Sequence, residues 1–224
     1  MDGIWAVVPV KDTTAAKQRL AAAVPPALRQ ALALAMLEDV LATLAASPGL
    51  AGRLVVTTDP AAMRLAARYG AECTAEAAAD GHTGAVMAAA RRLAGERRGG
   101  VLTVPGDVPL VTPAEIAALI AAHQPALAFT IAPSHDEKGS NAILMSPPDA
   151  VPLRFGEDSF FPHLRAAEAR GIVPVVVHLP GIALDIDNPA DLAHFAALGS
   201  RTRAGLWLAN NKAALSLPEA NRRE

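Results

Sequence analysis

Three aspartates could carry metal chemistry in this chain. Asp107 follows an apolar run that ends in a Pro-Gly turn, and Asp185 and Asp187 flank a single isoleucine. Successive side chains of an extended segment point to opposite sides, so Asp185 and Asp187 share one side. Neighbouring carboxylates favour a shared proton or a cation, and Mg²⁺ prefers one or two carboxylates together with substrate phosphates. We therefore expect a magnesium site at these residues, although a turn followed by a helix cap explains any single aspartate equally well.

Basic side chains follow the first apolar run of the sequence. Lys11, Lys17 and Arg19 come shortly after the run over residues 4–10. A solvated loop and a polyphosphate cradle both explain these charges, and in a cradle a lysine neutralises charge on transferring phosphates. The segment is not a Walker loop, because the glycines and the GK[ST] ending are missing. The chain offers acids and lysines but no convincing catalytic His or Cys, so charge neutralisation is the chemistry that we expect.

Two glycine turns precede predicted helices. Gly81 and Gly84 punctuate one turn, and Gly156 stands shortly before a helix start at Ser159. A helix start with small residues can bind a phosphate or let a flat base lie on the backbone, while a plain cap turn explains the same pattern. His82, in the first of these turns, is expected to be a loop histidine rather than a ligand.

Strands and helices alternate along most of the chain, which predicts an α/β fold with a mostly parallel sheet covered on both faces. Ligands of such folds bind at the carboxyl ends of the strands, where Asp107 stands. We expect one domain over residues 1–199 and a C-terminal tail over residues 200–224. The patterns predict strands over residues 4–10, 53–57, 71–74, 101–104, 126–132, 140–146 and 174–179, and helices over residues 27–46, 59–69, 84–98, 113–123, 159–169 and 188–198.

Composition limits the class of protein. The 224 residues are 52% hydrophobic, enough for one good-sized α/β domain or two small ones. The net charge of −2 argues against nucleic acid as a main partner. The single cysteine, Cys73, excludes an internal disulfide framework, and we expect it to be an ordinary buried thiol in a reducing cytoplasm. The start of the chain has no signal-peptide pattern, and no apolar run is long enough to span a membrane.

Five motifs occur together in the sequence and carry a resemblance to a known family. They are VPVKD at 8–12 with Lys17 and Arg19, PGDVPL at 105–110, GSNA at 139–142, FG-x2-SF-x2-H at 155–163 and LDID-x-P-x-DL at 184–192. With these residues the chain resembles the nucleotidyltransferases of the molybdopterin-guanylyltransferase type. Within them it resembles the guanylyltransferases of coenzyme F-420 biosynthesis, over roughly residues 4–197.

This resemblance implies a Rossmann-like, three-layer nucleotidyltransferase (GT-A-like) domain with a Mg²⁺ cofactor. It implies transfer of GMP from GTP to 2-phospho-L-lactate, phosphoenolpyruvate or 3-phospho-D-glycerate with release of pyrophosphate, and it leaves open which acid is used and whether the chain forms a homodimer. The implied metal ligands are Asp107, Asp185 and Asp187, and the implied catalytic residues are Lys17 and Asp107. The implied acceptor site is Ser140, Asn141, Gly156 and Ser159, and the implied nucleotide site is Pro9, Lys11, Lys17, Gly81 and Thr83.

Two other hypotheses stay open at this point. A molybdenum-cofactor nucleotidyltransferase would have a glycine-rich first loop, and the Pro-Val-Lys-Asp-Thr-Thr segment of this chain weighs against it. A non-catalytic nucleotide-binding module would keep its role when Asp107 is replaced by asparagine. The loop between Gly81 and Gly84 departs from the commoner G-L-N-x-A pattern of the family, so selection of guanine is the least direct of these inferences.

Overall fold

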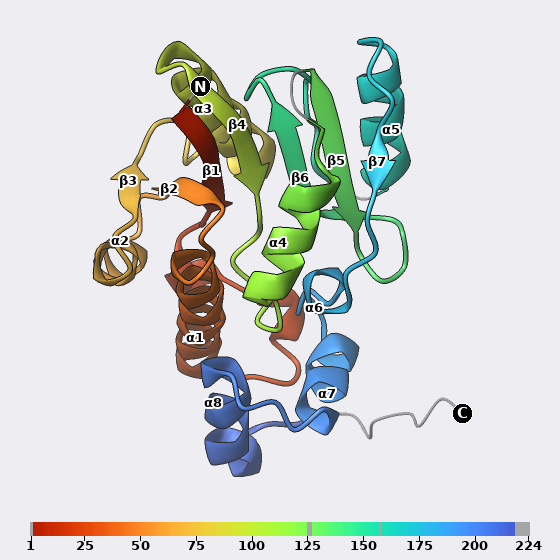
Figure 1. Cartoon of the computed structure of the whole chain (residues 1–224). Helices are drawn as coiled ribbons and strands as arrows, with labels where there is room; N and C mark the ends of the chain where they lie inside the picture. The colour runs from red at the N-terminus through yellow and green to blue at the C-terminus, as the bar shows by residue number, and fades with distance from the viewer. Residues whose placement is uncertain (1, 125–126, 157, 218–224) are drawn as a thin grey trace.

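A seven-stranded sheet in the order β3-β2-β1-β4-β6-β5-β7 forms the centre of the protein (Figure 1). The structure, a computed structural model, describes residues 2–124, 127–156 and 158–217. Strand β6 runs antiparallel to both of its neighbours, and the other neighbouring pairs are parallel. The prediction of a mostly parallel α/β sheet is therefore confirmed. The strands are β1 (Asp2–Pro9), β2 (Leu50–Val56), β3 (Glu72–Thr74), β4 (Arg98–Thr103), β5 (Ala128–Pro133), β6 (Ser140–Ser146) and β7 (Val175–Val176).

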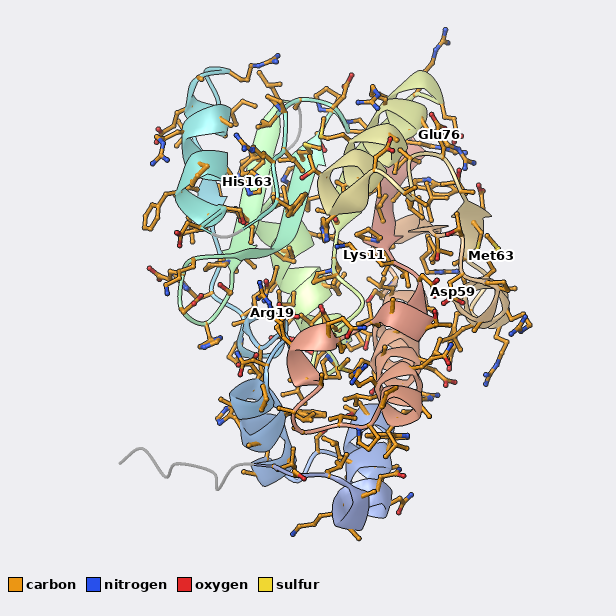
Figure 2. All side chains as sticks on the ribbon, turned by 180° about the vertical axis from the view of Figure 1, so that it is seen from behind. Lys11, Arg19, Asp59, Met63, Glu76 and His163 are labelled. Carbon is orange, nitrogen blue, oxygen red and sulfur yellow. The ribbon has the colours of Figure 1, made fainter. Side chains whose placement is uncertain are left out.

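Helices cover both faces of the sheet. They are α1 (Pro26–Ala45), α2 (Pro60–Arg68), α3 (Gly81–Gly95), α4 (Pro113–Ala122), α5 (Phe160–Glu168), α6 (Pro180–Ala183), α7 (Pro189–Ala197) and α8 (Arg203–Asn211), with the 3₁₀ turns η1 (Thr13–Ala15), η2 (Gln18–Leu20) and η3 (Lys212–Ala214). Side chains of α1, α2 and α4 pack with Ala6 and Val8 of β1, while those of α3 and α5 pack with Val7. Both faces of β1 are thus buried, as is usual for a central parallel strand. Figure 1 shows α4 in front of the sheet and α1 below the strands, and Figure 2, seen from behind, shows α3 and α5 in front.

A third apolar cluster attaches the last helices to α1. Leu192 and Phe195 of α7, and Ala204 and Leu208 of α8, are buried in it. The buried carboxylate of Asp39 on α1 accepts the backbone N–H groups of residues 203 and 204, at 2.8 and 2.9 Å, and so caps the start of α8. The segment predicted as a tail therefore contains a helix that packs on the domain, and residues 218–224 lie outside the described part of the chain.

Several predicted element boundaries were wrong. Helix α3 begins at Gly81 and ends at Gly95, so His82 lies in a helix rather than in a loop. The strand predicted over 174–179 is only two residues long, since Pro180 already opens α6. Cys73 is exposed rather than buried, because β3 is a three-residue strand at the edge of the sheet. The first residue of the strand predicted over 126–132 lies outside the described residues.

The sheet brings one set of loops to one edge. Strands β1 and β4 are parallel neighbours, so the segments after Pro9 and Thr103 leave the sheet on the same side. Strand β6 runs the other way between β4 and β5, and therefore its first residues, Ser140 and Asn141, lie at this same edge. Among the described residues, no helix is long and apolar enough to cross a membrane.

Candidate active site

A cleft of about 1400 Å³ opens at this edge of the sheet. Its walls come from the loop after β1, the start of α3, the loop after β4, the β5–β6 turn, the loop before α5 and the segment before α7. Figure 2 places Lys11 and Arg19 at mid-height of the molecule, below α3 and α5 and above α7 and α8. All of the site residues predicted from the sequence line this one cleft: Pro9, Lys11, Lys17, Gly81, Thr83, Asp107, Ser140, Asn141, Gly156, Ser159, Asp185 and Asp187.

Lys17 lies between two of the predicted metal ligands. Its Nζ atom is 2.5 Å from Asp107 Oδ2 and 2.9 Å from Asp187 Oδ1, and its side chain is only 10% exposed. The backbone of Lys17 is left-handed, with φ of 55°, a conformation that costs energy for a residue with a Cβ atom and occurs often at functional sites. Burial opposes the charge of Lys17, but the two carboxylates outweigh burial and raise its pKa, so the ammonium stays protonated.

Asp185 stands beside this ion pair and is held by Asn141. The Asn141 Nδ2 atom donates to Asp185 Oδ1 at 3.0 Å and to the carbonyl oxygen of Ile182 at 2.9 Å. Burial, together with the negative charges of Asp107 and Asp187, raises the pKa of Asp185. The amide nitrogen of Asn141 is therefore engaged in positioning the Asp185 segment, and binding of the acceptor by Asn141 stays a prediction.

The carboxylates form an oxygen-rich site that fits a hard divalent cation. Asp107 and Asp187 already share one cation, the Lys17 ammonium, and Asp185 is close enough for its pKa to respond to both of them. Within the described residues, no group of three His, Cys, Asp or Glu side chains is arranged as a ready-made metal site. A Mg²⁺ ion at these carboxylates would therefore need water and substrate phosphates to complete its shell.

A second polar pocket of the cleft lies where β6 begins and α5 begins. Ser140 Oγ is 2.9 Å from His163 Nδ1 and 3.5 Å from the buried Ser159 Oγ. Gly156 adopts a φ of 154°, which L residues rarely adopt, and a Cβ atom there would meet no atom within 4 Å. Ser140, Gly156 and Ser159 all line the cleft.

The start of α3 forms the opposite wall and is tied to the loop before α5. Thr83 Oγ1 accepts the backbone N–H of Phe155 at 2.9 Å, and the His82 ring packs on the Phe155 ring with a centroid distance of 4.3 Å. Burial lowers the pKa of His82 to about 4, so this imidazole is neutral at pH 7. Gly81, with a φ of 76°, opens the helix without a side-chain cap, which leaves its first amides available to a ligand.

One supporting contact was not found from the sequence. The Asp59 carboxylate caps α2, and it also accepts hydrogen bonds from the backbone N–H (2.7 Å) and the hydroxyl of Thr13. Burial works to raise the pKa of Asp59, but these hydrogen bonds hold it below its ordinary value. Asp59 therefore fixes the loop that carries Lys17. No sequence signal pairs these two segments, whereas His163 was visible as the last position of the FG-x2-SF-x2-H motif.

Comparison with known proteins finds relatives over nearly the whole chain. Residues 4–223 match the sequence profile of a family described as "Guanylyl transferase CofC like". A phosphoenolpyruvate guanylyltransferase of Rubrobacter xylanophilus is 39% identical over 196 residues, which cover 88% of this chain and 95% of that protein. A 3-phospho-D-glycerate guanylyltransferase of Colwellia psychrerythraea is 36% identical over 194 residues, which cover 87% and 91%. A solved structure of 4-diphosphocytidyl-2C-methyl-D-erythritol synthase shares the fold, with a TM-score of 0.63 and 13% identity over 89% of this chain and 99% of that one.

Proposed function

Because the chain belongs to the family of CofC-like guanylyl transferases, we propose that it transfers GMP from GTP to phosphoenolpyruvate in coenzyme F-420 biosynthesis. Phosphoenolpyruvate is the acceptor in the name of the Rubrobacter xylanophilus relative, and 3-phospho-D-glycerate in the name of the Colwellia psychrerythraea relative. The observation that carries the proposal is a single cleft that holds both the Lys17–carboxylate cluster and the two serine hydroxyls.

In the proposed reaction, a phosphate oxygen of the acceptor attacks the α-phosphorus of GTP, and the bond to the leaving pyrophosphate breaks. The attacking oxygen is already anionic at neutral pH, so no general base is required. The difficulty is that two anions must approach each other in the correct orientation. Binding in the cleft sets the orientation, and positive charge in the cleft reduces the repulsion between the anions. This agrees with the imidazole of His82, which lines the cleft and is neutral at pH 7 because burial lowers its pKa to about 4.

The groups that would bind Mg²⁺ and the triphosphate of GTP come from four side chains and Lys11. Asp107, Asp185 and Asp187 would hold Mg²⁺, which when bound neutralises phosphate charge. The Lys17 ammonium has three N–H donors, of which two are used by carboxylates, so one remains for a phosphate oxygen of GTP. Lys11 is exposed within the cleft and adds a second positive charge on the triphosphate side.

The remaining walls of the cleft would bind the nucleotide and the acceptor at separate places. The first amides of α3, at Gly81 and Thr83, face the nucleotide, and Ser140, Gly156 and Ser159 bind the acceptor. A three-carbon phospho-acid fits this smaller pocket because it offers few groups beyond its phosphate and carboxylate. Both substrates are intracellular metabolites, and we therefore place the enzyme in the cytoplasm.

The test is pyrophosphate release from GTP with phosphoenolpyruvate, 2-phospho-L-lactate or 3-phospho-D-glycerate as the acceptor, each with Mg²⁺ and with EDTA. We expect Mg²⁺-dependent release with phosphoenolpyruvate and formation of the mixed diphosphate, detected by mass spectrometry. CTP in place of GTP is the control for base selection. Faster release with another of the three acids would overturn the choice of acceptor, and no release with any of them would overturn guanylyl transfer itself.

A further inference from the structure

His163 lies behind the wall of the acceptor pocket and does not line the cleft itself. It belongs to α5, and only 1% of its surface is exposed; Figure 2 shows it on that helix. Both ring nitrogens have polar partners. Nδ1 is 2.9 Å from Ser140 Oγ, and Nε2 is 3.0 Å from the backbone nitrogen of Arg154. A buried ring with two such contacts has a defined orientation.

The partner of Nε2 decides which nitrogen carries the proton. The Arg154 backbone nitrogen can only donate, so Nε2 must accept and cannot be protonated. In a neutral imidazole the proton then lies on Nδ1, which donates to Ser140 Oγ. Burial is the main cause that lowers the pKa of His163 to about 4, and this keeps the ring neutral at pH 7. A protonated ring would place an N–H against the N–H of Arg154.

The direction of this hydrogen bond fixes the role of the serines. Ser140 Oγ accepts from His163, so its own proton is free to be donated. Among the described residues, its other polar side-chain contact is Ser159 Oγ, at 3.5 Å. Whichever serine donates to the other, one hydroxyl proton of the pair has no side-chain acceptor among the residues that the structure describes. Both serines line the cleft, so this proton is available to an anion there.

We propose that His163 is a positioning residue for the acceptor: its Nδ1–H orients the Ser140 hydroxyl so that the serine pair donates to the anionic group of the phosphorylated acid. The inference rests on the proposed function, which it extends from the residues that touch the acceptor to the residue that directs them. The ring also contacts Phe155 edge-on, with a centroid distance of 5.0 Å, and Phe155 is the residue whose N–H binds Thr83. His163 therefore supports the loop before α5 as well as Ser140.

Two substitutions separate these contacts. In His163→Gln, the amide reaches the place of Nε2, where its oxygen accepts the Arg154 N–H, and the donor to Ser140 is lost. In His163→Asn, the amide nitrogen stands where Nδ1 stood and donates to Ser140. We expect His163→Gln to raise the KM for the acceptor at least about tenfold, the scale of a lost hydrogen bond that supports a charged ligand. The KM for GTP should stay within about twofold, and His163→Asn should recover most of the loss.

A double-mutant cycle with Ser140→Ala shows whether His163 acts through that hydroxyl. We expect Ser140→Ala alone to raise the acceptor KM, and His163→Gln to add less than about twofold in that background. His194→Gln, at an exposed position of α7, is the matched control for the same exchange on a helix. Circular dichroism establishes that each variant is folded.

The possible failures can be told apart. If the parent chain releases no pyrophosphate with any of the three acids, the proposed function fails and the inference fails with it. If the parent is active but His163→Gln leaves the acceptor KM unchanged, only the inference is overturned. It is also overturned if the effects of His163→Gln and Ser140→Ala multiply, or if His163→Gln raises both KM values equally, because either result would indicate a general structural role.

Discussion

Replacing Asp107 by asparagine tests the charge arrangement on which the proposed function depends. Asparagine keeps the volume of the side chain, but it removes the carboxylate that lies 2.5 Å from Lys17 Nζ, one of the two that contact this atom. The same carboxylate is a proposed Mg²⁺ ligand. Two unit charges about 4 Å apart interact by about 4 kcal/mol at an effective dielectric constant near 20. A loss of that size in the transition state corresponds to a decrease of about a thousandfold in kcat/KM.

The assay is pyrophosphate release with GTP and phosphoenolpyruvate over a range of Mg²⁺ concentrations. We expect the loss to be largest at low Mg²⁺ and to be partly recovered at high Mg²⁺, because a weakened site is refilled by mass action. The fold should survive, since Lys17 keeps its contact of 2.9 Å with Asp187. Circular dichroism and urea unfolding measure this separately from turnover.

The matched control is Asp158→Asn, which removes an exposed carboxylate from the same cleft. Asp158 has a φ of 55°, and asparagine tolerates that conformation about as well as aspartate does. We expect this variant to keep its activity within about threefold. Turnover of Asp107→Asn within about tenfold of the parent, or an equal loss in both variants, would refute the assignment of Asp107 as a metal ligand.

Three further predictions concern the end of the chain, the acceptor pocket and pH. We propose that α8 belongs to the same folding unit as the sheet. Leu208→Ala, at a buried position of α8, should lower the free energy of unfolding in urea titrations by about 2–4 kcal/mol. Leu206→Ala, at a position of the same helix that is 52% exposed, should change it by less than about 0.5 kcal/mol. Gly156→Ala should raise the KM for the acceptor but not for GTP in the pyrophosphate assay, because a Cβ atom would extend into open space beside the serines and the φ of 154° disfavours alanine. The folded-state pKa of His163, about 4, lies below its ordinary value of 6.5, so the unfolded chain binds this proton more readily. The contribution of His163 to the free energy of unfolding should be complete above pH 6.5 and should fall by about 2 kcal/mol on going to pH 5, in addition to the loss from His82. A His163→Asn variant whose free energy of unfolding falls as much as that of the parent between these pH values would contradict this.

The fold was predictable from the sequence because most of its longer strands contain a short apolar run, and helical patterns separate these runs. The position of β6 was not. The sequence indicates that a strand returns at Ser140, but its insertion between β4 and β5 depends on pairing between distant segments, which local patterns do not encode. Helix α8 left a detectable signal, since Ala204 and Leu208 are four residues apart and both are buried. The helix propensity of this segment is too weak to predict α8 with certainty from the sequence. Packing of α8 on the rest of the domain stabilises it as a helix.

The candidate site was predictable to a similar degree. The two-residue spacing of Asp185 and Asp187 indicated a shared side, and the strand end indicated Asp107. The contacts that hold these groups could not be found in this way. Lys17 meets Asp107 across 90 positions of sequence and Asp187 across 170. Asn141 was predicted to bind the acceptor from its place in a motif, while the structure shows its amide nitrogen bound to Ile182 and Asp185.

The charges around Lys17 support the proposal that a divalent cation takes part in the reaction. The Lys17 ammonium contacts Asp107 and Asp187, and Asp185 lies close to both of these carboxylates. When all three carboxylates are ionised, the group carries two negative charges beyond the one that Lys17 compensates. Arg19 approaches Asp187 only to 4.0 Å and is largely exposed, so its contribution is reduced by solvent. A triphosphate that enters the cleft meets this excess before it reaches the acceptor. Lys17 alone cannot offset it, because two of its three donors already serve the protein. A doubly charged cation would offset this excess, and we therefore expect GTP binding to this chain to depend on Mg²⁺ even before any acceptor is present.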